Sequence, residues 1–65
     1  MYNNKIRKFR ESKNKTLKEL ANEVGISAGY LSHLERGSRN NPSKEVMERI
    51  ADALDSSIAT IFFSK

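Results

Sequence analysis

The single histidine, His33, follows Ser32 directly, and this pair is the nearest that the sequence comes to a catalytic arrangement. Catalysis needs a nucleophile beside a base, a pair of carboxylates or a metal. Neighbouring residues on a helix point about 100° apart, so these two side chains would not meet. The chain also has no cysteine and no glycine-rich phosphate-binding motif. We therefore expect no enzyme, no metal site and no cofactor.

The chemistry that the composition favours is the binding of a polyanion. The 65 residues include 12 Lys and Arg against 8 Asp and Glu, which gives a net charge of +4. The positive charge is concentrated in residues 1–20, whereas residues 21–42 are neutral overall and residues 43–65 are slightly acidic. A basic segment on a basic domain suits nucleic acid, although a solvated lysine-rich surface would have the same composition. The lack of cysteine favours a cytoplasmic setting, and we expect no membrane partner because no apolar run approaches the required length of about 20 residues.

The elements that would position these groups are short amphipathic helices, and the best marked begins at Thr16. Apolar residues at i, i+3, i+4 and i+7 run from Leu17 to Val24, which predicts one buried stripe on a helix. Thr16 precedes this stripe and Glu19 follows three residues later. That spacing predicts a capping box, in which each residue bonds the other's backbone amide.

A tight turn and a second helix follow. Gly25 suits the left-handed residue that ends a helix, and Ser27 suits the N-cap of the next one. Leu31 and Leu34 would supply the buried side of this second helix, which we expect to end at Gly37. Two helices around a short glycine-containing turn form a helix-turn-helix, whose second helix can enter the DNA major groove. A plain helical hairpin would have the same periodicity.

Three further helices complete the expected fold, an all-α compact bundle of about five short helices that forms a single domain over residues 1–65. The first lies within residues 1–15, with Asn3 or Asn4 as its cap. Another opens at Ser43 and carries a wide apolar stripe, so we expect it to be central to the core. The last follows Ser57 and leaves Phe63 off its apolar side.

The stretch from Leu17 to Leu54 contains Leu20-Ala21, Gly25-Ile26-Ser27, Leu31-Ser32, Leu34-Glu35-Arg36-Gly37 and Asn41-Pro42-Ser43. Because of these residues it resembles the Cro-type, or XRE-type, helix-turn-helix family of bacterial and phage regulators, and within it the DNA-binding domain of SinR-like repressors. The resemblance implies a lambda-repressor-like fold and a sequence-specific regulator of transcription that binds double-stranded DNA. It further implies a cytoplasmic repressor that acts as a homodimer.

The resemblance also assigns roles, and it makes the helix from about Ser27 to Glu35 the recognition helix. Leu17 stands where many relatives have a DNA-contacting glutamine, so only nearby backbone amides could hold a phosphate there. Small residues at the groove-facing positions cannot make bidentate base contacts, although alanine can meet a thymine methyl group. DNA shape would then share in the specificity. The implied DNA-binding residues are Thr16, Leu17, Ser27, Ala28, Gly29, Tyr30, Ser32, His33, Arg36, Arg39, Asn40 and Asn41.

Several of these roles have alternatives. His33 could be merely solvated, as could the loop that carries Arg39. Arg10 and Glu35 occupy the family positions of a structural ion pair, but Arg10 could instead contact DNA. Phe63 is a candidate contact for a second copy of the chain, or it could fold back onto its own monomer.

Two other functions remain open at the level of the sequence. The fold could serve as a protein-interaction module of an antitoxin-like or anti-repressor kind, or the domain could bind nucleic acid without sequence preference.

Overall fold

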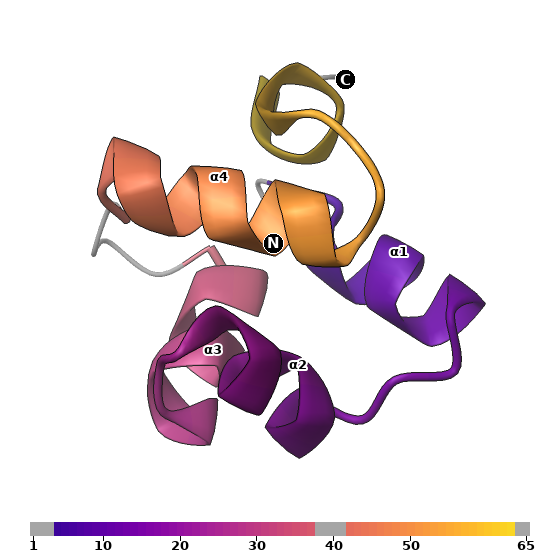
Figure 1. The fold of residues 1–65 in the computed structure, drawn as a ribbon, viewed down its shortest axis with the longest axis vertical. Coiled ribbons are helices and arrows are strands. Elements are labelled where there is room, and N and C mark those ends of the chain that lie inside the picture. Colours follow the sequence, from indigo (N-terminus) through magenta and orange to yellow (C-terminus); the bar gives the residue numbers. More distant parts are fainter. Residues whose placement is uncertain (1–3, 38–41, 64–65) are drawn as a thin grey trace.

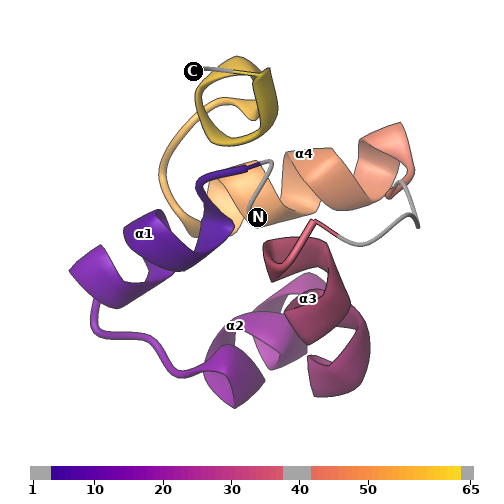
Figure 2. The same cartoon turned by 180° about the vertical axis from the view of Figure 1, so that it is seen from behind.

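A computed structural model describes residues 4–37 and 42–63 of the chain. Figure 1 shows α2 and α3 together on one side of α4, the final turn on its opposite side, and α1 beside the C-terminal end of α4. Figure 2 shows the same arrangement from behind. This arrangement confirms the expected all-α bundle with a helix-turn-helix. The elements within the described residues are α1 (Ile6–Ser12), α2 (Leu17–Val24), α3 (Ala28–Glu35), α4 (Lys44–Ala53) and a π-helical turn, η1 (Ala59–Phe63).

The core is assembled from all five elements. Fully burying a leucine or isoleucine contributes about 1.5–3 kcal/mol, so each short helix is stabilised chiefly by its contribution to the shared core. α4 supplies Ile50 and Ala51, and Leu54 at its C-cap, as its expected wide stripe requires. The buried apolar residues are Ile6, Leu20, Ala21, Val24, Leu31, Leu34, Ile50, Ala51, Leu54 and Ile61.

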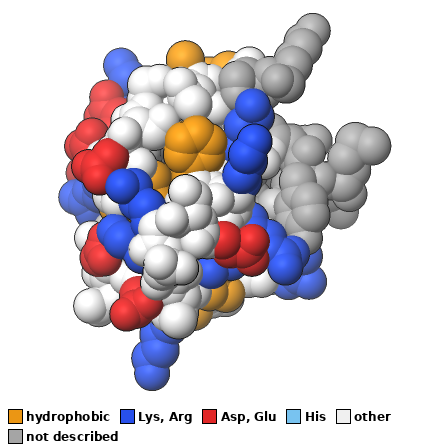
Figure 3. Space-filling model, turned by 90° about the vertical axis from the view of Figure 1, so that its right-hand side faces the viewer, with side chains coloured by type: hydrophobic (Ala, Val, Ile, Leu, Met, Phe, Trp, Pro, Cys, Tyr) orange, Lys and Arg blue, Asp and Glu red, His pale blue; other side chains and the backbone are white. Residues whose placement is uncertain are grey.

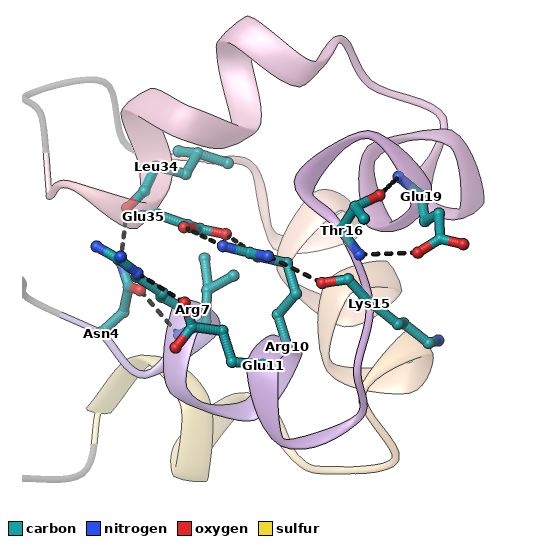
Figure 4. A network of polar contacts seen from close by, with 10 residues as sticks. Asn4, Arg7, Arg10, Glu11, Lys15, Thr16, Glu19, Leu34 and Glu35 are labelled. Carbon is teal, nitrogen blue, oxygen red and sulfur yellow. Dashed lines mark hydrogen bonds and ion pairs between the residues drawn. The ribbon is translucent and has the colours of Figure 1, made fainter.

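The expected capping box opens α2. Thr16 Oγ1 accepts a hydrogen bond from the Glu19 backbone N at 3.0 Å, and Glu19 Oε1 accepts one from the Thr16 backbone N at 2.8 Å (Figure 4). The bond from the Thr16 amide favours the charged carboxylate and lowers the pKa of Glu19. At the other end, Gly25 ends the helix with φ 84°, a left-handed conformation that glycine adopts without a steric penalty.

Serine caps the later elements, as the sequence predicts. Ser27 Oγ accepts from the Tyr30 backbone N at 3.0 Å to open α3, and Ser43 Oγ accepts from the Val46 backbone N at 3.2 Å to open α4. Ser57 Oγ accepts from the backbone N of Thr60 at the start of the last turn, which is π-helical. These side chains satisfy amides that would otherwise lack a partner at a helix start.

Residues 4 and 5, which precede α1, form hydrogen bonds to α1, α3 and η1. Asn4 Oδ1 accepts from the backbone N of Ile6, the first residue of α1, at 3.0 Å, while Asn4 Nδ2 donates to the Leu34 carbonyl at 2.7 Å. The Lys5 backbone N donates to the Ile61 carbonyl at 2.8 Å. The N-cap position of α1 is held by Lys5, which makes no side-chain cap bond, so the expected cap at Asn4 is displaced by one residue. Asn3 lies outside the described residues. The start of α1 thus joins the end of α3 to η1.

Two lysines of the connector between α1 and α2 anchor the C-terminal end of α4. Lys15 Nζ donates to Glu23 Oε1 at 2.7 Å and to the Ala53 carbonyl at 3.0 Å. Lys13 Nζ pairs with Asp55 at 2.7 Å, and this bond lowers the pKa of the Asp55 carboxyl. Positive charge near the carbonyl end of a helix also suits its dipole. The connector therefore joins α2 to α4.

Within the described ranges, no helix combines the length and the apolar character that a membrane span needs.

We predict that the capping box makes the fold less stable as the pH falls in the acidic range. The folded state lowers the pKa of Glu19. The charged Glu19 carboxylate therefore contributes fully to the free energy of unfolding above the ordinary glutamate pKa of about 4.3. This contribution is lost as the pH falls through the lower pKa of the folded state. Glu19→Gln should therefore flatten the fall of Tm below pH 5, measured by circular dichroism. Thr16→Ala should cost about 1 kcal/mol at neutral pH.

The matched control for this prediction is Glu48→Gln, which changes an exposed glutamate on α4. An acid profile that Glu19→Gln and Glu48→Gln alter equally would show that the capping box is not the source of the pH dependence.

Candidate nucleic-acid interface

One side of α3 is buried in the core and the other side is exposed to solvent. Leu31, Leu34 and Glu35 are buried, whereas Gly29 and His33 are exposed. The three buried residues lie at i, i+3 and i+4, which places them on one face of the helix. Gly29 and His33 are four residues apart and share a different face. Of the four groove-facing positions that the resemblance implies, Gly29 and His33 are exposed, whereas Ala28 and Ser32 are half-buried.

Other predicted site residues lie along the same helix. Tyr30 packs partly against the core, and Ser32 is half-buried. Arg36 is the C-cap residue of α3 and is exposed. Ser27 is exposed, but its hydroxyl is already engaged as the helix cap. The helix thus presents a mixed polar surface with one cation near its C-terminal end.

A shallow open groove of about 630 Å³ separates the start of α2 from the start of α3. Ala28 lines it from the first turn of α3, and Thr16 lines it from the capping box of α2. Leu17 is half-buried and packs against the core. The groove is lined by Thr16, Lys18, Glu19, Ala21, Asn22, Ile26 and Ala28.

The rest of the predicted site follows α3 in the chain. Arg39, Asn40 and Asn41 lie outside the described residues.

A buried ion pair fixes the C-terminal end of α3 to α1. Arg10 Nε donates to Glu35 Oε2 at 2.7 Å, and Arg10 Nη2 donates to Glu35 Oε1 at 3.3 Å. The two side chains are only 12% and 7% exposed. Arg10 Nη1 also donates to the Lys15 carbonyl at 2.8 Å (Figure 4). The structural ion pair expected from the resemblance is therefore confirmed, and these three bonds turn the guanidinium inward.

The surface around α1 mixes charges of both signs. Figure 3 shows Lys and Arg side chains interspersed with Asp and Glu rather than a continuous basic surface. Arg7 pairs with Glu11 at 3.1 Å along α1, for example. Within residues 4–37 and 42–63, no group of three or more His, Asp or Glu side chains is placed to hold a metal ion.

Sequence reasoning missed two long-range hydrogen bonds of the described residues, one from Asn4 and one from Lys15. The bond from Asn4 to the Leu34 carbonyl joins residues 30 positions apart, and Lys15 bridges to Ala53 across 38 positions. An asparagine before a helix signals a cap, but it gives no sign of a distant carbonyl. A lysine between two helices likewise gives no sign of which helix end it meets.

The fold and this surface define a helix-turn-helix domain, with α2 and α3 joined through Gly25. The sequence profile of the helix-turn-helix family matches residues 6–61, and the chain belongs to this family.

Curated relatives and solved structures agree with this assignment. The chain is 35% identical over 65 residues to the HTH-type transcriptional regulator SinR of Bacillus subtilis, a match that covers 100% of this chain and 59% of that protein. It is 38% identical over 56 residues to the transcriptional regulator ClgR of Mycobacterium tuberculosis, which covers 86% of this chain and 49% of that protein. The chain thus spans about half to three fifths of the length of these relatives.

The solved structures of SinR superimpose well on this fold. The solution structure of its N-terminal DNA-binding domain from Bacillus subtilis gives a TM-score of 0.81 at 35% identity, with 100% of this chain and 94% of that chain covered. The crystal structure of SinR in complex with DNA gives a TM-score of 0.79 at 38% identity, with 86% and 89% covered.

Proposed function

We propose that this chain is a single domain that binds double-stranded DNA and regulates transcription by reading the major groove with α3. The observation that carries the proposal is the exposed side of α3, held outward by the buried Arg10–Glu35 pair on its other side. The relative SinR, whose DNA complex has a similar fold, supports it. We propose further that the protein is a repressor, because a small domain can block a promoter simply by occupying it. We also propose that it acts in the cytoplasm.

The contacts divide into those that read bases and those that hold the DNA backbone. Ser32 and His33 offer a hydroxyl and an imidazole for base edges, which carry sequence information in the major groove. Arg36 and Tyr30 suit phosphate oxygens, which fix the position of the protein without reading sequence. Backbone contacts are also proposed for Thr16, Leu17 and Ser27, and for Arg39, Asn40 and Asn41, which follow α3.

We predict that selection from random duplexes yields a preferred site that binds about a thousandfold or more tightly than bulk DNA. The plot of log K against log salt concentration should fall by about 0.9 for each phosphate contact. Arg36→Ala should flatten that slope by about this amount and weaken preferred and bulk DNA alike.

Arg49→Ala is the matched control for this titration, because it removes the same charge from α4, where Arg49 pairs with Glu45 at 2.8 Å. It should leave the slope unchanged. Equal binding to all duplexes would indicate a non-specific nucleic-acid binder instead. No binding to any duplex would favour the protein-interaction module.

We also propose that the protein binds DNA as a homodimer through η1. Phe63 is 69% exposed, whereas Ile58 and Phe62 in the same segment are only half-buried against the core. A large exposed aromatic beside partly covered apolar residues is a surface that a second copy could cover. Two copies would also double the few base contacts that one α3 offers.

We predict a weak dimer that tightens on an inverted repeat with half-sites about 34 Å apart. Phe63→Ser should abolish the cooperativity of binding and shift sedimentation toward the monomer. Ala59→Ser, an exposed change in the same turn, is the control and should do neither. Affinity that is indifferent to half-site spacing, and unaffected by Phe63→Ser, would rule out the dimer.

A further inference from the structure

The exposed side of α3 carries the one histidine of the chain, His33. It lies in the last turn of the helix, on the side that we propose to bind DNA. Histidine is the residue whose ordinary titration falls within about pH 5 to 8. The chain has no cysteine, the other side chain that titrates in this range when its surroundings perturb it. We therefore expect the charge of this side of α3 to change with pH at one imidazole.

The charges of α3 itself leave its outer side without a carboxylate. Glu35 is the one acidic residue of α3, and it is buried on the inner side, where Arg10 donates to both of its oxygens. Arg36 is exposed three residues after His33, a spacing that makes two side chains neighbours on a helix surface. The carbonyl end of a helix also favours positive charge. This end of α3 therefore holds one permanent cation and one whose charge depends on pH.

The charged residues of the neighbouring elements are of types that ordinarily keep their charge in this range. Lys18 and Glu19 of α2 line the groove beside the first turn of α3, and Lys44 and Glu45 open α4. Carboxylates ordinarily titrate near pH 4, and lysine and tyrosine at about pH 10. The capping-box bond lowers the pKa of Glu19 further. A change in DNA affinity between about pH 5.5 and pH 8 would thus have His33 as its source on this surface.

We propose that His33 makes DNA binding depend on pH, because its imidazole takes up a proton from water when α3 meets DNA. The imidazolium has two N–H donors, whereas the neutral ring has one donor and one acceptor. It donates a charge-assisted hydrogen bond to an acceptor on the DNA, and the phosphates stabilise its positive charge. The complex holds more protons than the free protein, so the affinity rises as the pH falls. This inference rests on the proposed function, since it concerns the regulation of the same surface.

The first experiment measures the dissociation constant of the preferred duplex at a fixed salt concentration from about pH 8 to about pH 5.5. The affinity of the wild-type protein should rise about fivefold across this range, as expected when a neutral hydrogen bond becomes a charged one. Calorimetry in buffers of different ionisation enthalpy should show net proton uptake on binding. Circular dichroism at both ends of the range should show the same folded protein.

Two substitutions of His33 remove the titration in opposite ways. His33→Gln is uncharged throughout, so its affinity should be constant across the range. His33→Lys is charged throughout, so its affinity should also be constant, but log K should fall with log salt more steeply than for His33→Gln, by about 0.9. Both variants keep the amino terminus, another group that titrates near this range. Glu48→Gln, which changes an exposed glutamate on α4, is the control and should retain the full pH dependence.

Bulk DNA identifies the acceptor. An equal rise in affinity for preferred and bulk DNA would assign a phosphate oxygen, and a rise confined to the preferred duplex would assign a base edge. Either result supports the proposal. A wild-type affinity for the preferred duplex that stays constant with pH would overturn the proposal and leave the proposed function intact. A pH dependence that persists in His33→Gln would also overturn it. If the protein binds no duplex at any pH, the proposed function is overturned and this proposal with it.

Discussion

The position of α3 depends on one buried ion pair. Arg10 reaches from α1 and meets both oxygens of Glu35, while its third bond goes to the carbonyl of Lys15 in the connector. Two charges taken out of water are costly unless their hydrogen bonds are satisfied. Every buried side-chain nitrogen and oxygen in the described part of the chain has a partner. The pair therefore specifies which side of α3 is inward and, by exclusion, which side faces the solvent.

The other long-range contacts reinforce the same constraint. The Asn4 side chain donates a hydrogen bond to the carbonyl of Leu34, the residue before Glu35. The backbone N of the neighbouring Lys5 donates to the Ile61 carbonyl in η1. Lys15, whose carbonyl receives Arg10, bridges α2 and α4 with its side chain. These bonds join five short elements, none of which would be a stable helix alone at this length. The surface of α3 that we propose to bind DNA is thus held in place by contacts on the opposite, buried side of the helix.

Local features of the fold could be predicted from the sequence because each depends on a few neighbouring residues. The capping box at Thr16, the left-handed Gly25 and the serine caps all follow from spacing and side-chain type. The resemblance predicted the Arg10–Glu35 pair, which periodicity alone could not reach. The bridges of Asn4 and Lys15 could not be predicted, because their partners are backbone carbonyls that become neighbours only after folding. The open space around Gly29 likewise becomes evident only in three dimensions. The roles of individual residues on DNA stay predictions.

The most direct test of the account compares Arg10→Met with the double variant Arg10→Met/Glu35→Leu, by thermal unfolding and by binding to the preferred duplex. Arg10→Met alone leaves a buried carboxylate without its partner, which typically costs about 3–5 kcal/mol and should unfold much of the protein. An apolar pair of similar volume is often neutral or stabilising, so the double variant should recover both its melting temperature and its DNA affinity. A double variant that folds as stably as the wild type but no longer binds DNA would contradict the account, because Arg10 would then act on the DNA itself.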